Sequence, residues 1–251
     1  MDIDRIKRNL REHAIVGPLY RLFASARAAL RSARLRSAFD RYGEDSFRIV
    51  VRSLDSAGIL GFPAFGTLLG LVRESRLIPG DYDLDFAVIT EGGEYGWSAL
   101  VGALERAGFS ILRWFEYNGI VQEVAFTSPL SSRINVDFFT FARVSDGYVT
   151  HLFCRYADGE YGDASEMAVL RERLPHIDGF KCEEHLGVNV HTPANSEALL
   201  EATYGPSWRT PDPSWRYMFA PSNVMVEGAT AYVHWGDDGL RERLTGESSS
   251  S

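Results

Sequence analysis

Three aspartates alternate with apolar or aromatic residues in the segment Asp81-Tyr-Asp-Leu-Asp-Phe-Ala-Val. We expect residues 82–89 to form a strand, in which the three carboxylates would share one face about 6.6 Å apart at each step. Like charges in such a row raise the pKa of one another's carboxyl groups, and burial raises it further. A bound divalent cation would relieve this cost, and carboxylate oxygens favour Mg²⁺ or Mn²⁺. Asp81, Asp83 and Asp85 are therefore candidate metal ligands.

A calcium-binding EF-hand loop is an alternative interpretation of the same aspartates. Such a loop requires glycine at its sixth position and glutamate at its twelfth. The residues at those positions are Phe86 and Gly92, which excludes an EF-hand.

A further carboxylate, Asp137, lies in the apolar segment Arg133-Ile-Asn-Val-Asp-Phe-Phe-Thr-Phe. A carboxylate in so apolar a strand needs a partner, which a backbone amide or an arginine would also provide. If this strand neighbours residues 82–89, Asp137 completes a three-carboxylate metal site with Asp83 and Asp85.

Gly66 and Thr67 begin a segment that we expect to be helical. A glycine-bearing turn into a helix exposes backbone N–H groups to an anion, and Thr67 adds a hydroxyl donor. Arg73 and Arg76 would reach phosphate oxygens. The glycine spacing alone would equally serve close helix packing, and the Gly-Lys-Ser/Thr of a P-loop does not follow.

The elements that must position these residues alternate between helices and strands. Apolar spacing of three and four residues predicts helices, and alternating or continuous apolar runs predict strands. The expected helices cover residues 47–58, 67–75, 97–108 and 196–204, and the expected strands cover 82–89, 109–115, 119–126, 134–142 and 147–156. The prediction is an α+β fold with a mixed sheet flanked by helices.

The first 41 residues carry ten Lys and Arg against four Asp and Glu, a net charge of +6, whereas the remainder carries 16 against 30, a net charge of −14. We predict a basic helical extension over residues 1–43, interrupted at Gly17-Pro18, a catalytic domain over 44–235 and a disordered tail over 236–251. The extension would pack on the domain with solvated arginines, or lie on anionic lipid as a peripheral membrane contact.

Composition narrows the functional class. The 251 residues are 45% hydrophobic, 12% aromatic and 24% charged, which is typical of a globular protein. The net charge of −8 argues against a nucleic-acid partner. Two cysteines make no disulfide framework, and neither a membrane span nor a signal-peptide core is apparent, so we expect a cytoplasmic protein or one at the inner face of the membrane.

Two further constellations have both a functional and a structural interpretation. His151, Cys154, Cys182 and His185 have spacings that a zinc site would allow, but residues three apart on a strand point to opposite faces. The aromatic residues near the C-terminus would stack on a cytosine or a sugar ring, or belong to the core; they are Trp208, Trp215 and Tyr217.

The string from Gly66 to Val88 resembles the LicD/fukutin-like family, whose hallmark is Gly-Thr-Leu-Leu-Gly, then Arg, then Ile-Pro-Trp-Asp-x-Asp-x-Asp. That family belongs to the nucleotidyltransferase-fold, DNA polymerase beta-like, superfamily. The resemblance covers roughly residues 44–217. The family's C-terminal block resembles Pro193, the run from Ala198 to Gly205, Trp208 and Pro211. Gly80 replaces the usual Trp, and the first forty residues have no counterpart.

The resemblance implies roles for individual residues. Gly66 and Thr67 match the phosphate-binding turn, and Asp83 and Asp85 match the metal-binding pair. Asp81 matches the acidic residue just before that pair, and the carboxylate of the later strand is matched by Asp137.

The resemblance also implies an activity. It implies transfer of a phospho-alcohol, such as phosphocholine or ribitol phosphate, from a CDP-activated donor to a sugar hydroxyl. The cations held by the carboxylates would bridge the donor's diphosphate, and Asp137 would also help accept the proton of the hydroxyl. Two alternatives stay open at this point. The protein would add a nucleotide to a small acceptor, or it would bind nucleotides without catalysing a reaction.

Overall fold

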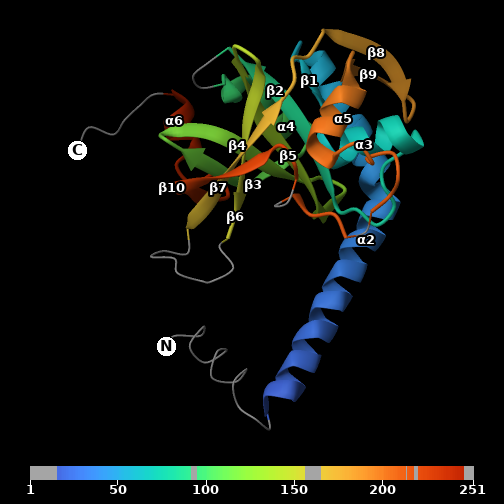
Figure 1. Cartoon of the computed structure of the whole chain (residues 1–251), viewed down its shortest axis with the longest axis vertical. Helices are drawn as coiled ribbons and strands as arrows, with labels where there is room; N and C mark the ends of the chain where they lie inside the picture. Colours follow the sequence, from blue (N-terminus) through green and yellow to red (C-terminus); the bar gives the residue numbers. More distant parts are fainter. Residues whose placement is uncertain (1–15, 92–94, 156–164, 213, 218–219, 246–251) are drawn as a thin grey trace, which may run out of the picture.

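The computed structural model describes residues 16–91, 95–155, 165–212, 214–217 and 220–245. Within them lie five helices and ten strands (Figure 1). The helices are α2 (Val16–Ser56), α3 (Phe65–Glu74), α4 (Trp97–Arg106), α5 (Ser196–Tyr204) and α6 (Leu240–Thr245). The strands are β1 (Gly61–Pro63), β2 (Asp83–Thr90), β3 (Ser110–Tyr117), β4 (Ile120–Ser128), β5 (Ser131–Val144), β6 (Gly147–Cys154), β7 (Glu166–Leu174), β8 (Phe180–His185), β9 (Val188–Pro193) and β10 (Asn223–Trp235).

Eight strands form one sheet in the order β1-β2-β5-β4-β3-β10-β7-β6, and β8 and β9 form a separate hairpin. The end of the long strand β5 also pairs with β6, so the sheet curves back on itself. Strands β2 and β5 are parallel, and the other pairs between described strands are antiparallel. The sheet is therefore mixed, as the sequence predicts.

The parallel pair separates core residues from polar ones by the alternation of side chains along each strand. Leu84 and Phe86 of β2 and Phe138 of β5 face α2 and α4 and belong to the main hydrophobic core. The ring of Phe86 stacks on that of Phe138, with 5.3 Å between centroids. Because adjacent residues point to the opposite face, the carboxylates of β2 and β5 lie on the side away from this core.

Helix α2 is one continuous helix of 41 residues that extends away from the body of the protein (Figure 1). Gly17 and Pro18 lie in its first turn and do not interrupt it, because proline is tolerated there. The boundary predicted between residues 43 and 44 falls inside this helix. Phe39 is already buried in the core on the N-terminal side of that boundary, so the helix enters the domain earlier than the charge distribution indicates.

The C-terminal prediction also needs a correction. Residues 236–245 were predicted to be disordered, but residues 240–245 form α6, and Leu240 is fully buried in the main core. The indole Nε1 of Trp114 donates to the carbonyl of Asp238 at 3.3 Å, which holds the connecting turn. The remainder of the predicted tail, residues 246–251, lies outside the described residues, as do residues 1–15 of the predicted extension.

Strands β1, β7, β8, β9 and β10 were not predicted from the sequence.

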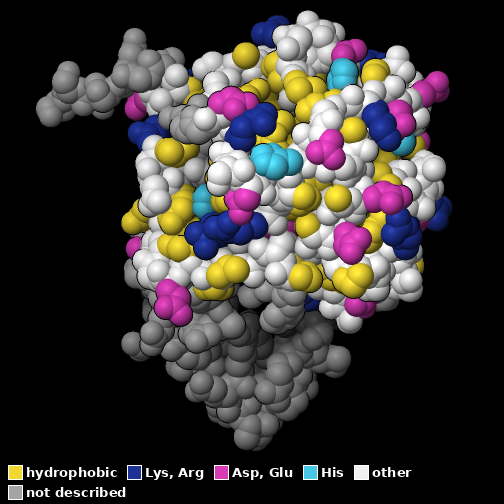
Figure 2. All heavy atoms as spheres, turned by 45° about the horizontal axis from the view of Figure 1, so that its top comes forward, with side chains coloured by type: hydrophobic (Ala, Val, Ile, Leu, Met, Phe, Trp, Pro, Cys, Tyr) yellow, Lys and Arg dark blue, Asp and Glu magenta, His cyan; other side chains and the backbone are white. Residues whose placement is uncertain are grey.

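The space-filling view shows basic, acidic and apolar side chains interspersed over one face of the molecule (Figure 2). Among the described helices, none combines the length and the apolar character that crossing a membrane requires.

Candidate metal centre

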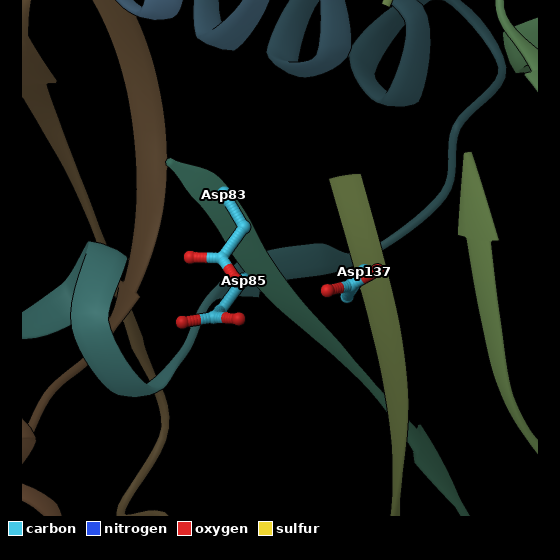
Figure 3. Close-up of side chains that lie close together, drawn as sticks. All are labelled: Asp83, Asp85 and Asp137. Atoms are coloured by element: carbon cyan, nitrogen blue, oxygen red, sulfur yellow. The ribbon is translucent and has the colours of Figure 1, made fainter. Parts of the chain in front are cut away.

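Carboxylates from two neighbouring strands converge above the sheet. Strand β2 pairs in parallel with β5, and Asp85 lies directly opposite Asp137 in the register. One oxygen from each of Asp83, Asp85 and Asp137 lies within 4.8 Å of the others, and Figure 3 shows the three side chains on the same side of the two strands. The structure therefore brings together the three residues that the sequence proposes as a metal site.

Asp81 lies just before β2, and its Oδ1 accepts the backbone N–H of Tyr82 at 3.0 Å. It shares a hydrogen bond with Asp83, but it does not belong to the group of three converging carboxylates. Its Oδ2 lies close to Gly66, beside Asp85. Asp81 is thus adjacent to the cluster, where it adds negative charge.

The electrostatics of the cluster favour a bound cation. Burial, together with the neighbouring carboxylates, raises the pKa of Asp83 and of Asp85 well above the ordinary value. Burial also raises the pKa of Asp137, against the opposing effect of Arg113, whose Nη2 lies 3.5 Å from Asp137 Oδ1. Burial and the charge of Asp137 raise the pKa of the fully buried Glu123. Oxygen ligands so close together, with one guanidinium beside them, fit a hard divalent cation such as Mg²⁺ or Mn²⁺.

The start of α3 holds Asp85 in place. The N–H of Gly66 donates to Asp85 Oδ2 at 3.0 Å, and the backbone N–H of Asp85 donates to Thr67 Oγ1 at 2.8 Å. The turn predicted to bind phosphate thus positions a carboxylate of the same chain. A Cβ at position 66 would lie 3.2 Å from an oxygen of both Asp81 and Asp85, so only glycine lets both carboxylates approach the helix this closely.

The two arginines predicted to bind substrate differ in their positions. Arg73 lines the cavity beside the cluster, and it donates to Glu74 Oε1 at 2.8 Å and to the carbonyl of Trp208 at 3.3 Å. Arg76 is exposed, lies 3.4 Å from Glu74 and does not line the cavity. The structure therefore places Arg73, but not Arg76, at the site.

The acidic cluster opens into a cavity of about 670 Å³. This volume is within the range of about 300–1,000 Å³ that is typical of small-molecule sites. The three aromatic residues whose role the sequence left open, Trp208, Trp215 and Tyr217, all line it. Trp208 is also buried in a small apolar cluster with Leu68 and Leu200, so it serves both packing and the cavity wall.

Polar residues that line this cavity but were not singled out as site residues in the sequence include Arg113, Glu123, Glu172 and Asn223. Glu123 lies in an apolar strand like Asp137, so the same signal was available for it. Arg113 gave no local signal, since its role depends on contacts between distant segments. Glu172 lies on β7, which was not recognised as a strand.

The predicted zinc ligands are not brought together. His151 and Cys154 lie on β6, whereas Cys182 and His185 lie on the separate β8–β9 hairpin. Burial, with a smaller effect from the charge of Arg171, lowers the pKa of His151 to about 4. Within the described part of the chain, the cluster of aspartates is the one group of three or more side chains able to hold a metal ion.

Comparison with known proteins gives distant relatives. No protein-family model matches the chain. The chain is 22% identical over 200 residues to ribitol-5-phosphate transferase FKTN of Macaca fascicularis and of Homo sapiens, covering 80% of this chain and 40% of each relative. The Mus musculus protein of the same name is 22% identical over 199 residues. These similarities are weak homology. The chain spans about 40% of the length of the curated relatives that it matches.

Proposed function

We propose that this protein is a metal-dependent transferase that moves a phospho-alcohol group, of the ribitol phosphate or phosphocholine kind, from a CDP-activated donor to a sugar hydroxyl. The observation that carries the proposal is the convergence of Asp83, Asp85 and Asp137 in a cavity of ligand size. The distant similarity to ribitol-5-phosphate transferases supports ribitol phosphate as the transferred group. We also propose a nucleotidyltransferase-like fold, in which a glycine-initiated helix precedes a two-aspartate strand.

Asp83, Asp85 and Asp137 would hold the cation, with Asp81 beside them. A bound Mg²⁺ or Mn²⁺ would neutralise charge on the donor's diphosphate and polarise the acceptor oxygen. The turn formed by Gly66 and Thr67 keeps Asp85 in position before any substrate arrives.

The reaction exchanges one phosphorus–oxygen bond for another. The acceptor oxygen forms a bond to the phosphorus that carries the alcohol, and the bond from that phosphorus to the bridging oxygen breaks, so CMP leaves. The hydroxyl's proton passes to a carboxylate oxygen of Asp137. Arg113 remains beside Asp137 and orients it.

The test is CMP release from CDP-ribitol in the presence of Mg²⁺ and a panel of sugar acceptors, with the product identified by mass. Asp83→Asn and Asp85→Asn should each lower kcat at least about 100-fold, because metal stabilisation of the transition state is worth several kcal/mol. Asp146→Asn is the matched control. Asp146 is exposed, its Oδ2 lies 3.3 Å from Arg173 Nη1, and it does not line the cavity.

Other outcomes would redirect the assignment. Pyrophosphate release from a nucleoside triphosphate would favour a nucleotidyltransferase. Nucleotide binding with Mg²⁺ but without any modified acceptor would favour a catalytically silent binding module. Near-wild-type activity of Asp83→Asn or Asp85→Asn would refute the metal site itself.

A further inference from the structure

A second polar wall of the cavity lies where β7 meets β10. Glu172 of β7 pairs directly with Asn223 of β10 in the antiparallel register, and both residues line the cavity. Directly opposed residues project from the same face of a sheet, roughly 5 Å apart at Cβ. Glu172 is fully buried. The acidic cluster does not use either residue.

The two carboxylate oxygens of Glu172 have different surroundings. Oε1 accepts hydrogen bonds from the hydroxyls of Thr203, at 2.6 Å, and Ser222, at 2.9 Å. Oε2 is equally buried and has no hydrogen-bond partner among the described residues. Leaving such an oxygen unpaired is costly, and because Glu172 lines the cavity, a hydrogen-bond donor on a ligand would satisfy it.

Asn223 presents a second acceptor of the same kind. Its Nδ2 donates to the carbonyl of Tyr217 at 2.6 Å, which fixes the orientation of the amide. Its Oδ1 is buried and has no hydrogen-bond partner in the described part of the chain. Two neighbouring residues of one cavity wall therefore each offer an acceptor to a donor group on a ligand.

The remaining surroundings identify the chemical class of the ligand. The indole N–H of Trp215 is buried and has no hydrogen-bond partner within the described ranges, and its ring centroid lies 4.5 Å from that of Tyr204. Hydroxyl groups both donate and accept, so a polyhydroxylated ligand satisfies acceptors and donors together. Phosphate offers acceptors alone, so it would leave Glu172 Oε2 and Asn223 Oδ1 without a donor.

We propose that Glu172 and Asn223 accept hydrogen bonds from two neighbouring hydroxyl groups of the substrate and so select a polyol or sugar over a group without hydroxyls. This inference rests on the proposed function, because the hydroxyls belong either to the alditol of the donor or to the acceptor sugar. A site built to pair a substrate hydroxyl discriminates strongly against an analogue that lacks it.

The test compares wild type, Glu172→Gln and Ser222→Ala by calorimetric titration with CDP and with CDP-ribitol in the presence of Mg²⁺. The amide oxygen introduced by Glu172→Gln would still accept from Thr203 and Ser222, so the variant keeps the local packing but turns a donor toward the ligand. Ser222→Ala is the control for a structural role, since Ser222 contacts Oε1 and does not line the cavity. Melting curves of all three proteins monitor folding.

If the hydroxyls are those of the donor, Glu172→Gln raises the dissociation constant of CDP-ribitol at least about tenfold and changes that of CDP less than about twofold. If they are those of the acceptor, donor affinity is unchanged and the KM of the sugar that wild type uses rises by a similar factor. Equal weakening of CDP and CDP-ribitol, no change in any measurement, or the same losses in Ser222→Ala would overturn the inference.

Failure of the proposed function has a separate signature, which is a wild-type protein that binds neither CDP nor CDP-ribitol. In that case, saturation-transfer NMR with free ribitol and methyl glycosides tests whether Glu172 binds a polyol, independently of the proposed reaction. A polyol that binds wild type and not Glu172→Gln upholds the inference, and a wild type that binds none of these polyols refutes it.

Discussion

Replacing Gly66 by alanine should separate folding from metal binding. Alanine is favoured over glycine in a helix by up to about 1 kcal/mol, so the helix itself gains. The new Cβ would lie 3.2 Å from Asp81 Oδ2 and from Asp85 Oδ2, which is closer than Cβ atoms normally approach oxygen, so both carboxylates must move by a few tenths of an ångström. That movement also weakens the 3.0 Å hydrogen bond from the N–H of residue 66 to Asp85.

The gain in helix propensity and the cost of displacing the two carboxylates oppose one another. We therefore expect the free energy of unfolding of Gly66→Ala to change by no more than about 1 kcal/mol in either direction. Metal sites tolerate little displacement, and changes in the groups that orient ligands typically cost about 10–100-fold in affinity. Calorimetric titration with Mn²⁺ should therefore show a dissociation constant raised by about that factor in Gly66→Ala, with a parallel loss of CMP release.

Gly102→Ala is the matched control. Gly102 also lies in a helix, α4, and its added Cβ would lie 3.2 Å from Nη1 of Arg106, the mobile end of a long side chain that moves aside easily. This variant should keep wild-type Mn²⁺ affinity and activity. If Gly66→Ala binds Mn²⁺ as tightly as Gly102→Ala does, the helix start does not position the carboxylates as we infer.

Three further perturbations test other parts of the structure. Because burial raises the carboxyl pKa of both Asp85 and Asp137 above the ordinary 3.8, and the charge of Asp137 raises that of Asp85 further, the folded protein binds more protons than the unfolded chain between that value and the raised ones. The stability of the protein kept free of metal by a chelator should therefore fall as the pH rises from the ordinary value through the raised pKa values, and Mg²⁺ or Asp85→Asn should reduce this dependence of the melting temperature on pH; a metal-free protein that is more stable at the higher pH contradicts this. Thr67→Val leaves the backbone N–H of Asp85 without its hydroxyl acceptor and should lower the free energy of unfolding, measured in urea, by about 1–3 kcal/mol. Thr67→Ser keeps the hydroxyl and should retain most of the wild-type stability. Leu240→Ala should cost about 2–5 kcal/mol, whereas a loss below about 0.5 kcal/mol would show that α6 is not part of the core.

Local patterns predicted the elements around the acidic cluster well. The alternation of residues 82–89 predicted β2, and the spacing of apolar residues predicted α4; helices were also expected over residues 67–75 and 196–204, where α3 and α5 lie. These elements are amphipathic, so their periodicity is visible in the sequence. The pairing of β2 with β5 was stated as a condition, because strand adjacency depends on the whole sheet and leaves no local signal.

The far wall of the cavity was not predictable in the same way. Strand β7 carries Arg171, Glu172 and Arg173 in succession, which lowers its apparent strand character. Glu172 is buried because Thr203 and Ser222, from distant segments, supply its hydrogen bonds. The C-terminal residues from 236 onward were predicted to be a disordered tail, but the burial of Leu240 in the main core anchors α6.

The parallel pairing of β2 and β5 has a consequence for the order of assembly. Helix α4 and strands β3 and β4 lie between β2 and β5 in the sequence, so this whole segment must fold before Asp137 can reach Asp85. Contacts between segments so distant along the chain form late, since the intervening loop must close first. No fragment ending before β5 contains all three ligands, so tight ion binding would accompany only the finished domain. An ion that binds the native state alone would then stabilise the whole domain by mass action, and cation availability would influence how long the protein survives as well as how fast it works.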